Sequence, residues 1–251
     1  METYAIRTEK LTKVYKKARF LSSKLTPGVK DVNLEVNTGE VYALLGLNGT
    51  GKTTTIKLIL GLLFPTEGSI EVFGVKMPND EIRRSVGYLP ELPYFYRNLT
   101  PREVLDLYGT LSGLNEHKRK QRCGEILELV RMTKYIDKRM GEFSKGMLQR
   151  IGIAQALLHD PQLLVFDEPV AGLDPVGIHE MRELLLNLKT QGKTLMFSSH
   201  IISEVEKISD RVGIMNNGQL AKVITQQEWV GKQDGLEKMF IDVVGENVIP
   251  R

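Results

Sequence analysis

The stretch "GLNGTGKTT", residues 46–54, combines glycines, a lysine and threonines at a spacing suited to binding phosphate. Its three glycines allow positive φ and a close backbone approach, so successive N–H groups can point at an anion. Lys52 adds a positive charge for terminal phosphates, and the Thr53 hydroxyl can bind Mg²⁺. The pattern GxxxxGK[ST] is matched without a mismatch. The predicted nucleotide-contacting residues of this loop are Gly46, Leu47, Asn48, Gly49, Thr50, Gly51, Lys52, Thr53 and Thr54.

Two adjacent carboxylates end a second apolar run, "LLVFDEP" at residues 163–169. Open α/β sheets bind ligands beyond the carboxyl ends of their strands. In that position Asp167 could hold Mg²⁺ through water, and Glu168 could accept a proton from an attacking water. The alternative is a strand that merely terminates in charged residues. The phosphate loop in the same chain favours the catalytic interpretation.

These side chains require a scaffold that ends several apolar strands at one edge. Strand-like runs alternate with helical patterns, which predicts an α/β sheet. The phosphate loop follows a predicted strand at 41–45 and opens a predicted helix from about 52 to 63, whose positive N-terminal end would face the anion. The other predicted strands are "VNLEV", "SIEVFG", "SVGYLP", "LLVFDE", "TLMFSS" and "RVGIM".

A long block between two of these strands is helical in pattern. Thr100 and Glu103 predict a capping box with Pro101 at the first helical position, and another helix is predicted to start at Ser144. "NNGQLAKV" predicts a hairpin, and the residues after it carry too little apolar content for a second folded domain. We therefore expect one domain: an α/β core of residues 1–90 and 161–225, a helical subdomain at 91–160, and a short tail at 226–251.

Composition narrows the class of protein. The 251 residues are 41% hydrophobic and 26% charged, as in soluble globular proteins, and the longest apolar runs fall short of the ~20 residues that cross a bilayer. A cytosolic protein is the simplest expectation. The single cysteine, Cys123, excludes an internal disulfide and a cysteine metal cluster. A net charge of +3 is too small to indicate nucleic acid.

Basic side chains gather in two segments. Seven lie between Lys10 and Lys30 without an acidic one, and a second cluster is "HKRKQR" at 117–122. Solvated surface is one interpretation. Attraction to anionic lipid headgroups or to an anionic substrate is the other, and it requires the two segments to share a face.

With these motifs in this order and at this approximate spacing, the chain resembles the nucleotide-binding subunit of an ATP-binding cassette (ABC) transporter over nearly its whole length. The resemblance implies an α/β fold of the P-loop NTPase class and the ABC type, with a mixed sheet core, an N-terminal antiparallel β part and an inserted helical subdomain. It also implies further site residues. Tyr15 would stack on adenine, and Glu91 would join Thr53 and Asp167 as a metal ligand. The signature residues, which would contact the ATP of the partner cassette, are Ser144, Lys145, Gly146 and Met147. Asp174 would belong to the family's D-loop, and His200 would be its switch histidine.

Each of these residues also has a structural interpretation. Tyr15 could be a core aromatic, Ser144 and Asp174 could act only as helix N-caps, and His200 could be an exposed loop residue. The exposed-looking aromatics at 94–96 could receive a membrane partner or pack inside the helical subdomain. We adopt the functional interpretations because the motifs form an ordered set.

Two departures from the family pattern distinguish the chain. Glu91 stands where most of the family has glutamine. The signature usually written LSGGQ is here "FSKGM" at 143–147, in which the serine and the second glycine remain and Lys145 replaces the first glycine. A carboxylate at position 91 can still bind Mg²⁺, with a different charge. The combination resembles the branch that energises small exporters of drugs, antibiotics, lipids or polysaccharides.

The resemblance implies how such a subunit would work. Two cassettes, identical or not, would pair head to tail around two molecules of ATP with Mg²⁺, Glu168 would activate water, and His200 would hold the γ-phosphate. Hydrolysis would drive separate transmembrane permease subunits from the cytoplasmic face of the membrane, without nucleic acid. A non-transport ATPase of the same superfamily and a simple nucleotide kinase are the alternatives, although a kinase would not need Ser144 or His200. The sequence leaves the cargo open, and the short tail favours export.

Overall fold

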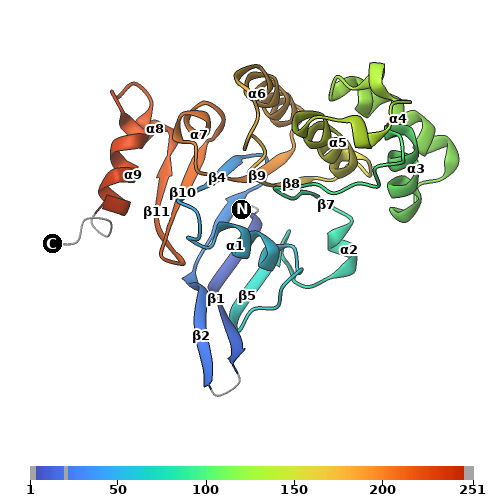
Figure 1. Cartoon of the computed structure of the whole chain (residues 1–251). Coiled ribbons are helices and arrows are strands. Elements are labelled where there is room, and N and C mark those ends of the chain that lie inside the picture. Colours follow the sequence, from blue (N-terminus) through green and yellow to red (C-terminus); the bar gives the residue numbers. More distant parts are fainter. Residues whose placement is uncertain (1–3, 20–21, 246–251) are drawn as a thin grey trace. The chain divides into compact units, whose positions relative to one another are not determined.

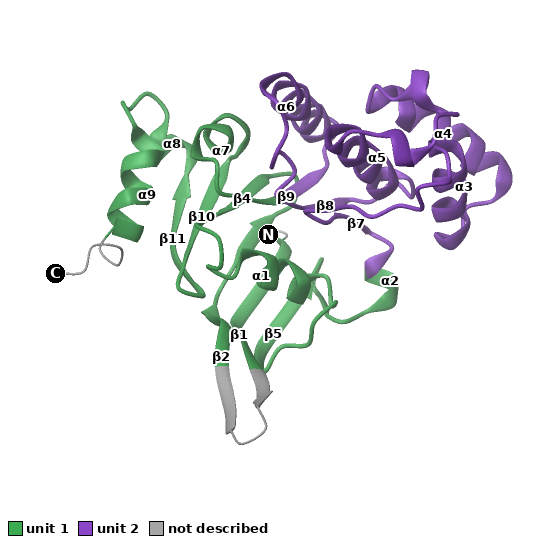
Figure 2. Ribbon diagram, viewed as in Figure 1, with its two compact units in different colours: residues 1–82, 196–251 green, residues 83–195 purple. Residues whose placement is uncertain are grey.

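The computed structural model describes residues 4–19 and 22–245, with the side chains of 4–15 and 26–245 (Figure 1). It divides into two compact units (Figure 2). Unit 1 comprises residues 1–82 and 196–251, and unit 2 comprises residues 83–195. The chain passes from one unit to the other within α2 (Asp80–Arg83) and returns within β9 (Thr194–Ser199).

Unit 1 contains an antiparallel sheet, as expected for the N-terminal part. Its strands are β1 (Tyr4–Arg19), β2 (Ser22–Val32), β3 (Glu35–Asn37), β5 (Glu67–Val72) and β6 (Val75–Lys76). The order is β2-β1-β5-β6, and β3 also pairs with β1. The sequence patterns identified β3 and β5 but missed β1 and β2, in which lysines interrupt the apolar alternation.

The phosphate-loop side of unit 1 is built on buried parallel strands. β4 (Val41–Leu45) pairs in parallel with β10 (Arg211–Asn216), which forms the predicted hairpin with β11 (Gln219–Thr225). Every residue of β4 is buried, so this strand reads as a continuous apolar run. The helix after the loop, α1 (Lys52–Ile59), ends before residue 63 because Gly61 adopts a φ of 65°.

The C-terminal residues of unit 1 add three helices. These are α7 (Ile202–Ile208), α8 (Gln226–Trp229) and α9 (Gly235–Gly245), and α9 packs on α7 and β10. Trp229, Leu236 and Phe240 are buried there. Among the described residues, every helix is too short or too polar to cross a membrane.

Unit 2 contains the helical block that the sequence predicted. Its parallel strands are β7 (Val86–Leu89) and β8 (Leu163–Asp167). Helix α5 (Lys145–Leu157) packs on β7. Helices α3 (Pro101–Leu111) and α4 (Glu116–Leu129) pack against α5. The capping box of Thr100 and Glu103 is confirmed. Two short 3₁₀ turns, Thr133–Tyr135 and Met140–Glu142, precede α5, and α6 (Pro175–Thr190) follows β8.

Candidate functional site

The phosphate loop has the backbone that its glycines predict. Gly49 and Gly51 have φ values of 83° and 102°, in the region that favours glycine. A Cβ on Gly51 would lie 2.8 Å from the Gly28 carbonyl oxygen, and one on Gly46 would lie 2.7 Å from the Met215 carbonyl oxygen. Neighbouring backbone therefore fills the space that side chains would need at two of the three positions.

Distant segments of unit 1 hold this loop through backbone hydrogen bonds. The N–H of Gly46 donates to the Ser199 carbonyl at 3.2 Å, and the N–H of Gly218 donates to the Thr50 carbonyl at 3.1 Å. The first bond ties the loop to the end of β9, directly before the exposed His200. The structure thus brings the strand that ends at the predicted switch histidine to the phosphate loop.

Lys52 lies along the loop that it follows. Its side chain is 6% exposed, and Nζ donates to the carbonyls of Gly46 at 2.7 Å and Leu47 at 3.2 Å. No side chain caps the N-terminus of α1, where Gly51 is the N-cap residue. The helix start therefore keeps N–H groups and a positive dipole end for an anion. Thr53 is half-buried in the first turn of α1, and Asn48 and Gly49 are exposed.

Tyr15 reaches the end of the phosphate loop. The half-buried side chain has its hydroxyl 3.4 Å from Thr54 Oγ1. Its ring covers Gly28, where a Cβ would lie 2.5 Å from Tyr15 Cε2, and Lys13 Nζ lies 5.8 Å from the ring centroid. This position beside the loop favours the nucleotide-contacting interpretation over a core aromatic.

The two carboxylates lie in unit 2, at the end of β8. Asp167 and Glu168 are 2% and 6% exposed. Glu168 has a φ of 51°, a left-handed conformation that costs a non-glycine residue about 1–3 kcal/mol and is concentrated at functional sites. Burial raises the pKa of Tyr88 in β7 to about 12, and the negative charge of Asp167 contributes to the rise.

The predicted signature and D-loop residues both cap helices. Ser144 is the N-cap of α5, and its Oγ accepts a hydrogen bond from the N–H of Met147 at 3.3 Å. Asp174 caps α6, accepting from the N–H of Gly177 at 2.7 Å. The capping interpretation is confirmed for both residues. A serine that accepts at a cap still has an O–H to donate, so capping leaves room for a ligand contact.

Near Glu91, two aromatic side chains are exposed and one is buried. Glu91 is exposed, and Tyr94 and Tyr96 are 84% and 65% exposed. Phe95 is 7% exposed and makes an edge contact with Tyr108 at 6.3 Å between ring centroids. Packing inside the helical subdomain is therefore confirmed for Phe95, and contact with a membrane partner stays a prediction for the exposed Tyr94 and Tyr96.

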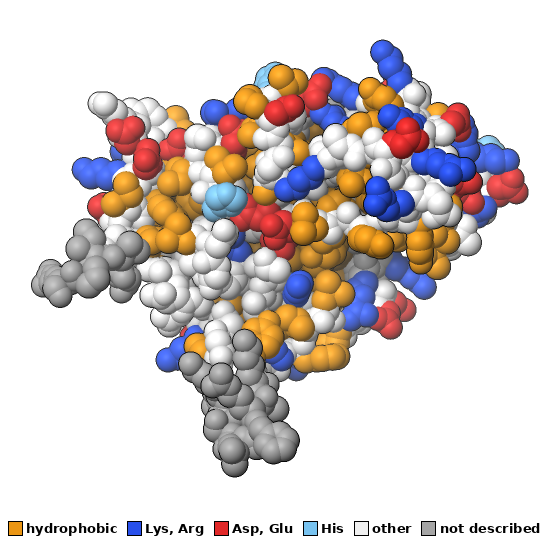
Figure 3. All heavy atoms as spheres, in the orientation of Figure 1, with side chains coloured by type: hydrophobic (Ala, Val, Ile, Leu, Met, Phe, Trp, Pro, Cys, Tyr) orange, Lys and Arg blue, Asp and Glu red, His pale blue; other side chains and the backbone are white. Residues whose placement is uncertain are grey.

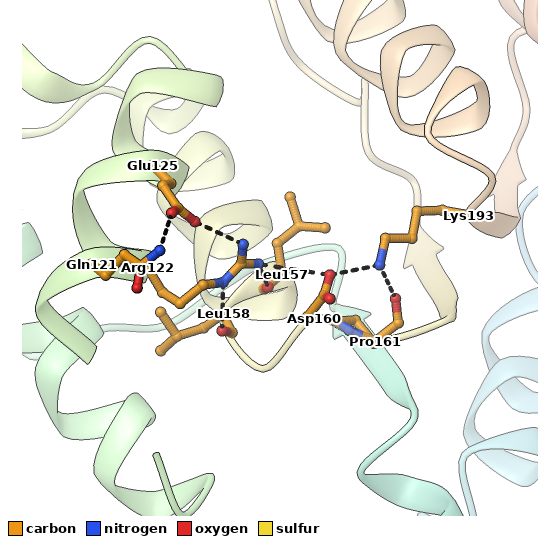
Figure 4. A network of polar contacts seen from close by, with 8 residues as sticks. All are labelled: Gln121, Arg122, Glu125, Leu157, Leu158, Asp160, Pro161 and Lys193. Carbon is orange, nitrogen blue, oxygen red and sulfur yellow. Dashed lines mark hydrogen bonds and ion pairs between the residues drawn. The ribbon is translucent and has the colours of Figure 1, made fainter. Parts of the chain in front are cut away.

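The basic cluster at 117–122 is paired with acidic side chains. Arg119 contacts Asp106 at 2.7 Å, Lys120 contacts Glu116 at 2.7 Å, and acidic and basic side chains alternate over this end of unit 2 (Figure 3). Arg122 donates to the carbonyls of Leu157 and Leu158 at the end of α5 (Figure 4). This arrangement favours a solvated structural face. Much of the other basic segment, 10–30, lies outside the described side chains.

Both units contain predicted oxygen donors for a divalent cation: Thr53 in unit 1, and Glu91 and Asp167 in unit 2. Among described residues, no group of three or more His, Cys, Asp or Glu side chains could hold a metal by itself. Magnesium needs only one or two protein ligands when phosphates and water supply the rest. The Thr53 hydroxyl and the Asp167 carboxylate are oxygen donors of the type it prefers, so the residues fit MgATP.

Several residues that support the site were not predicted from the sequence. They make contacts with residues far away in the chain, and the motifs that contain some of them do not indicate these contacts. They are Gly28, Ser199, Met215 and Gly218 around the phosphate loop, and Gln149 and Gly172 beside the segment after Glu168. The "NNG" turn of the predicted hairpin was a signal for Gly218 as a turn residue, though not for its bond to the loop.

Comparison with known proteins identifies the family. A family model described as ABC transporter matches residues 29–171. The bacitracin transport ATP-binding protein BcrA of Bacillus licheniformis is 46% identical over 222 residues, 87% of this chain and 69% of the relative. The lantibiotic transport ATP-binding protein SrtF of Streptococcus pyogenes is 38% identical over 94% of this chain and 95% of its own.

A solved structure extends this similarity to the fold. The ATP-binding cassette MJ0796, a dimer in a post-hydrolysis state bound to ADP and Pi, has a TM-score of 0.79 and 25% identity, covering 88% of this chain and 98% of that chain. The chain belongs to the ABC transporter family, as an ATP-binding and ATP-hydrolysing subunit.

Proposed function

We propose that two cassettes hydrolyse MgATP at composite sites, each made by the phosphate loop of one chain and the start of α5 of the other. The exposed Ser144 at the N-terminus of α5 carries this proposal, because its hydroxyl and the neighbouring N–H groups suit a phosphate. The dimeric state of the similar cassette MJ0796 supports it. Identical and different partner cassettes both satisfy this arrangement.

Within such a site each residue has a distinct role. The loop N–H groups and Lys52 bind the phosphates, and Tyr15 stacks on the adenine. Thr53, Asp167 and Glu91 would hold Mg²⁺, which neutralises developing charge on the phosphates. Glu168 accepts the proton of the attacking water, and His200 contacts the γ-phosphate. Met147, Lys145 and Gly146 complete the signature, and Asp174 lies at the interface with the partner chain.

We further propose that the chain energises export through separate membrane subunits. Relatives named for bacitracin and lantibiotic transport support an antibiotic-type cargo. The exposed side chains of Leu92, Tyr94 and Tyr96 supply an apolar surface for a cytoplasmic segment of such a subunit. The chain would then work at the cytoplasmic face of the membrane, and contact of segment 10–30 with anionic lipid stays part of this proposal.

Reconstitution with a candidate membrane subunit tests the transport role. We expect ATPase activity in proteoliposomes to rise when bacitracin or a lantibiotic is added, and Tyr94→Ser with Tyr96→Ser to remove this rise while leaving the basal activity of the isolated chain. Basal hydrolysis that no membrane subunit changes, together with activation by DNA or ribosomes, would favour the non-transport alternative.

A further inference from the structure

Lys145, which replaces the first glycine of the family's signature, lies across the segment that follows Glu168. A Cβ built on Gly172 would lie 2.6 Å from Lys145 Nζ and 3.5 Å from both Cδ and Cε. The lysine side chain therefore occupies the space that the glycine leaves. Gly172 has a φ of 70°, so the turn itself also favours glycine.

The location of Lys145 is not explained by an ion pair. Its side chain is exposed, and within residues 4–19 and 22–245 its ammonium group takes part in no hydrogen bond or salt bridge. Packing on Gly172 is thus the contact that this side chain makes with the turn. The ammonium group lies nearest to Gly172, and Cδ and Cε follow at 3.5 Å from the same Cβ position, so the outer half of the side chain covers the turn.

Two further contacts join α5 to the same segment. A Cβ on Gly146 would lie 3.4 Å from Leu173 Cδ2, and the fully buried Gln149 donates from Nε2 to the Pro169 carbonyl at 3.3 Å. The first turns of α5 thus contact residues 169, 172 and 173. This segment begins immediately after Glu168 and ends at Asp174, the cap of α6.

We propose that Lys145 is a positioning residue of the ATPase. Its side chain holds the turn at Gly172 against the start of α5, and so fixes the backbone that carries Glu168 relative to the helix end that meets the partner's nucleotide. This inference rests on the proposed function, in which Glu168 is the base and α5 contacts that nucleotide. Because misplacement by about 1 Å can cost about 10²-fold in rate, a small shift of this turn affects turnover.

The test compares side chains of different length and charge at position 145. We expect Lys145→Gly to lower kcat about tenfold with KM for ATP nearly unchanged, and Lys145→Met, which keeps an unbranched chain as far as Cε but lacks the ammonium group, to lose clearly less. Lys118→Gly, at an exposed lysine in the first turn of α4, controls for loss of helix propensity. A fall in Lys145→Met as large as that in Lys145→Gly would overturn the proposal, because the charge and not the packing would then be needed.

A double-mutant cycle with Gly172→Ala examines the contact itself. The new methyl group would displace the lysine, so this variant should also lose kcat, and the loss should be smaller in the Lys145→Gly background. Losses that multiply independently would contradict the inference. Glu168→Gln is measured in parallel: if it keeps wild-type activity the proposed function fails, whereas if only the Lys145 variants are unaffected the inference alone fails.

Discussion

The phosphate loop of unit 1 and the segment after β8 in unit 2 are built on different principles. The loop is proposed to bind through its backbone, and backbone of β2, β9, β10 and the β10–β11 turn contacts it. The segment in unit 2 acts through side chains, and helix caps and one buried amide support it. Changes in the loop should therefore affect nucleotide binding, and changes in the segment should affect turnover.

The largest expected effect is on turnover, at Glu168. Glu168→Gln keeps the volume of the side chain but removes the proton acceptor, so hydrolysis should fall by about 10²- to 10⁴-fold. Affinity for ATP should survive because the phosphate loop lies in the other unit and is unchanged. Single-turnover phosphate release and fluorescent nucleotide titration measure the two quantities separately. Equal losses of affinity and turnover would contradict the division of binding and turnover between the phosphate loop and the segment after β8.

A smaller loss, in binding, is expected at Gly51. Gly51→Ala places a Cβ 2.7 Å from Val29 Cγ1 and 2.8 Å from the Gly28 carbonyl oxygen, at a φ of 102°. We expect affinity for ATP to fall by about tenfold or more, with about 1–3 kcal/mol lost from the free energy of unfolding. Gly49→Ala is the matched control, since its φ is 83° and no atom lies within 4 Å of the new Cβ. Titration calorimetry should show a larger loss of ATP affinity in Gly51→Ala than in Gly49→Ala. The reverse order would contradict the steric argument.

A modest effect is expected at Glu91. Glu91→Gln should preserve binding of MgATP and change kcat only a few-fold, because both side chains present an oxygen to the metal. Comparing titrations with and without Mg²⁺ isolates the contribution of the metal. Loss of nucleotide binding in this variant would show that the role assigned to residues around Glu91 is wrong.

The smallest effect concerns stability and pH in unit 2. Burial lowers the pKa of His159, whose Nε2 lies 3.2 Å from the Val86 carbonyl oxygen. The charge of Asp160 opposes this shift of the pKa, and the charges of Arg122 and Lys193 add to it. The unfolded chain, with a histidine pKa of about 6.5, then binds more protons than the folded chain as pH falls below that value. Urea unfolding at pH 7.5 and 5.5 should show lower stability at pH 5.5, and His159→Gln should reduce that difference. If the stability of His159→Gln depends on pH as that of the wild type does, His159 is not the source of the dependence.

Sequence reasoning succeeded where chemistry is contained in a short stretch. The phosphate loop, the caps at Ser144 and Asp174 and the capping box at Thr100 depend on neighbouring residues, so their spacing was sufficient. The family resemblance supplied the proposed roles of Tyr15 and His200, which spacing alone does not indicate and which stay predictions. The fold class followed from alternating strand and helix patterns together with that resemblance.

Sequence reasoning failed where contacts join distant segments. Lysines in β1 and β2 hid their strand pattern, and backbone pairing across the sheet overrides such local preferences. The contact of Lys145 with Gly172 joins residues of two motifs that are separate in sequence, and nothing in either motif indicates it. The left-handed backbone of Glu168 also had no local signal, because glutamate rarely adopts it.

The central claim is that two chains complete each ATP site, and light scattering coupled to size-exclusion chromatography tests it most directly. Glu168→Gln, which binds ATP but cannot cleave it, should elute as a dimer with MgATP and as a monomer without nucleotide. Adding Ser144→Arg should prevent the dimer by occupying the place of the partner's γ-phosphate, and Lys52→Ala in the Glu168→Gln background should prevent it by loss of affinity. A dimer that forms without ATP, or one that Ser144→Arg leaves intact, would contradict the account.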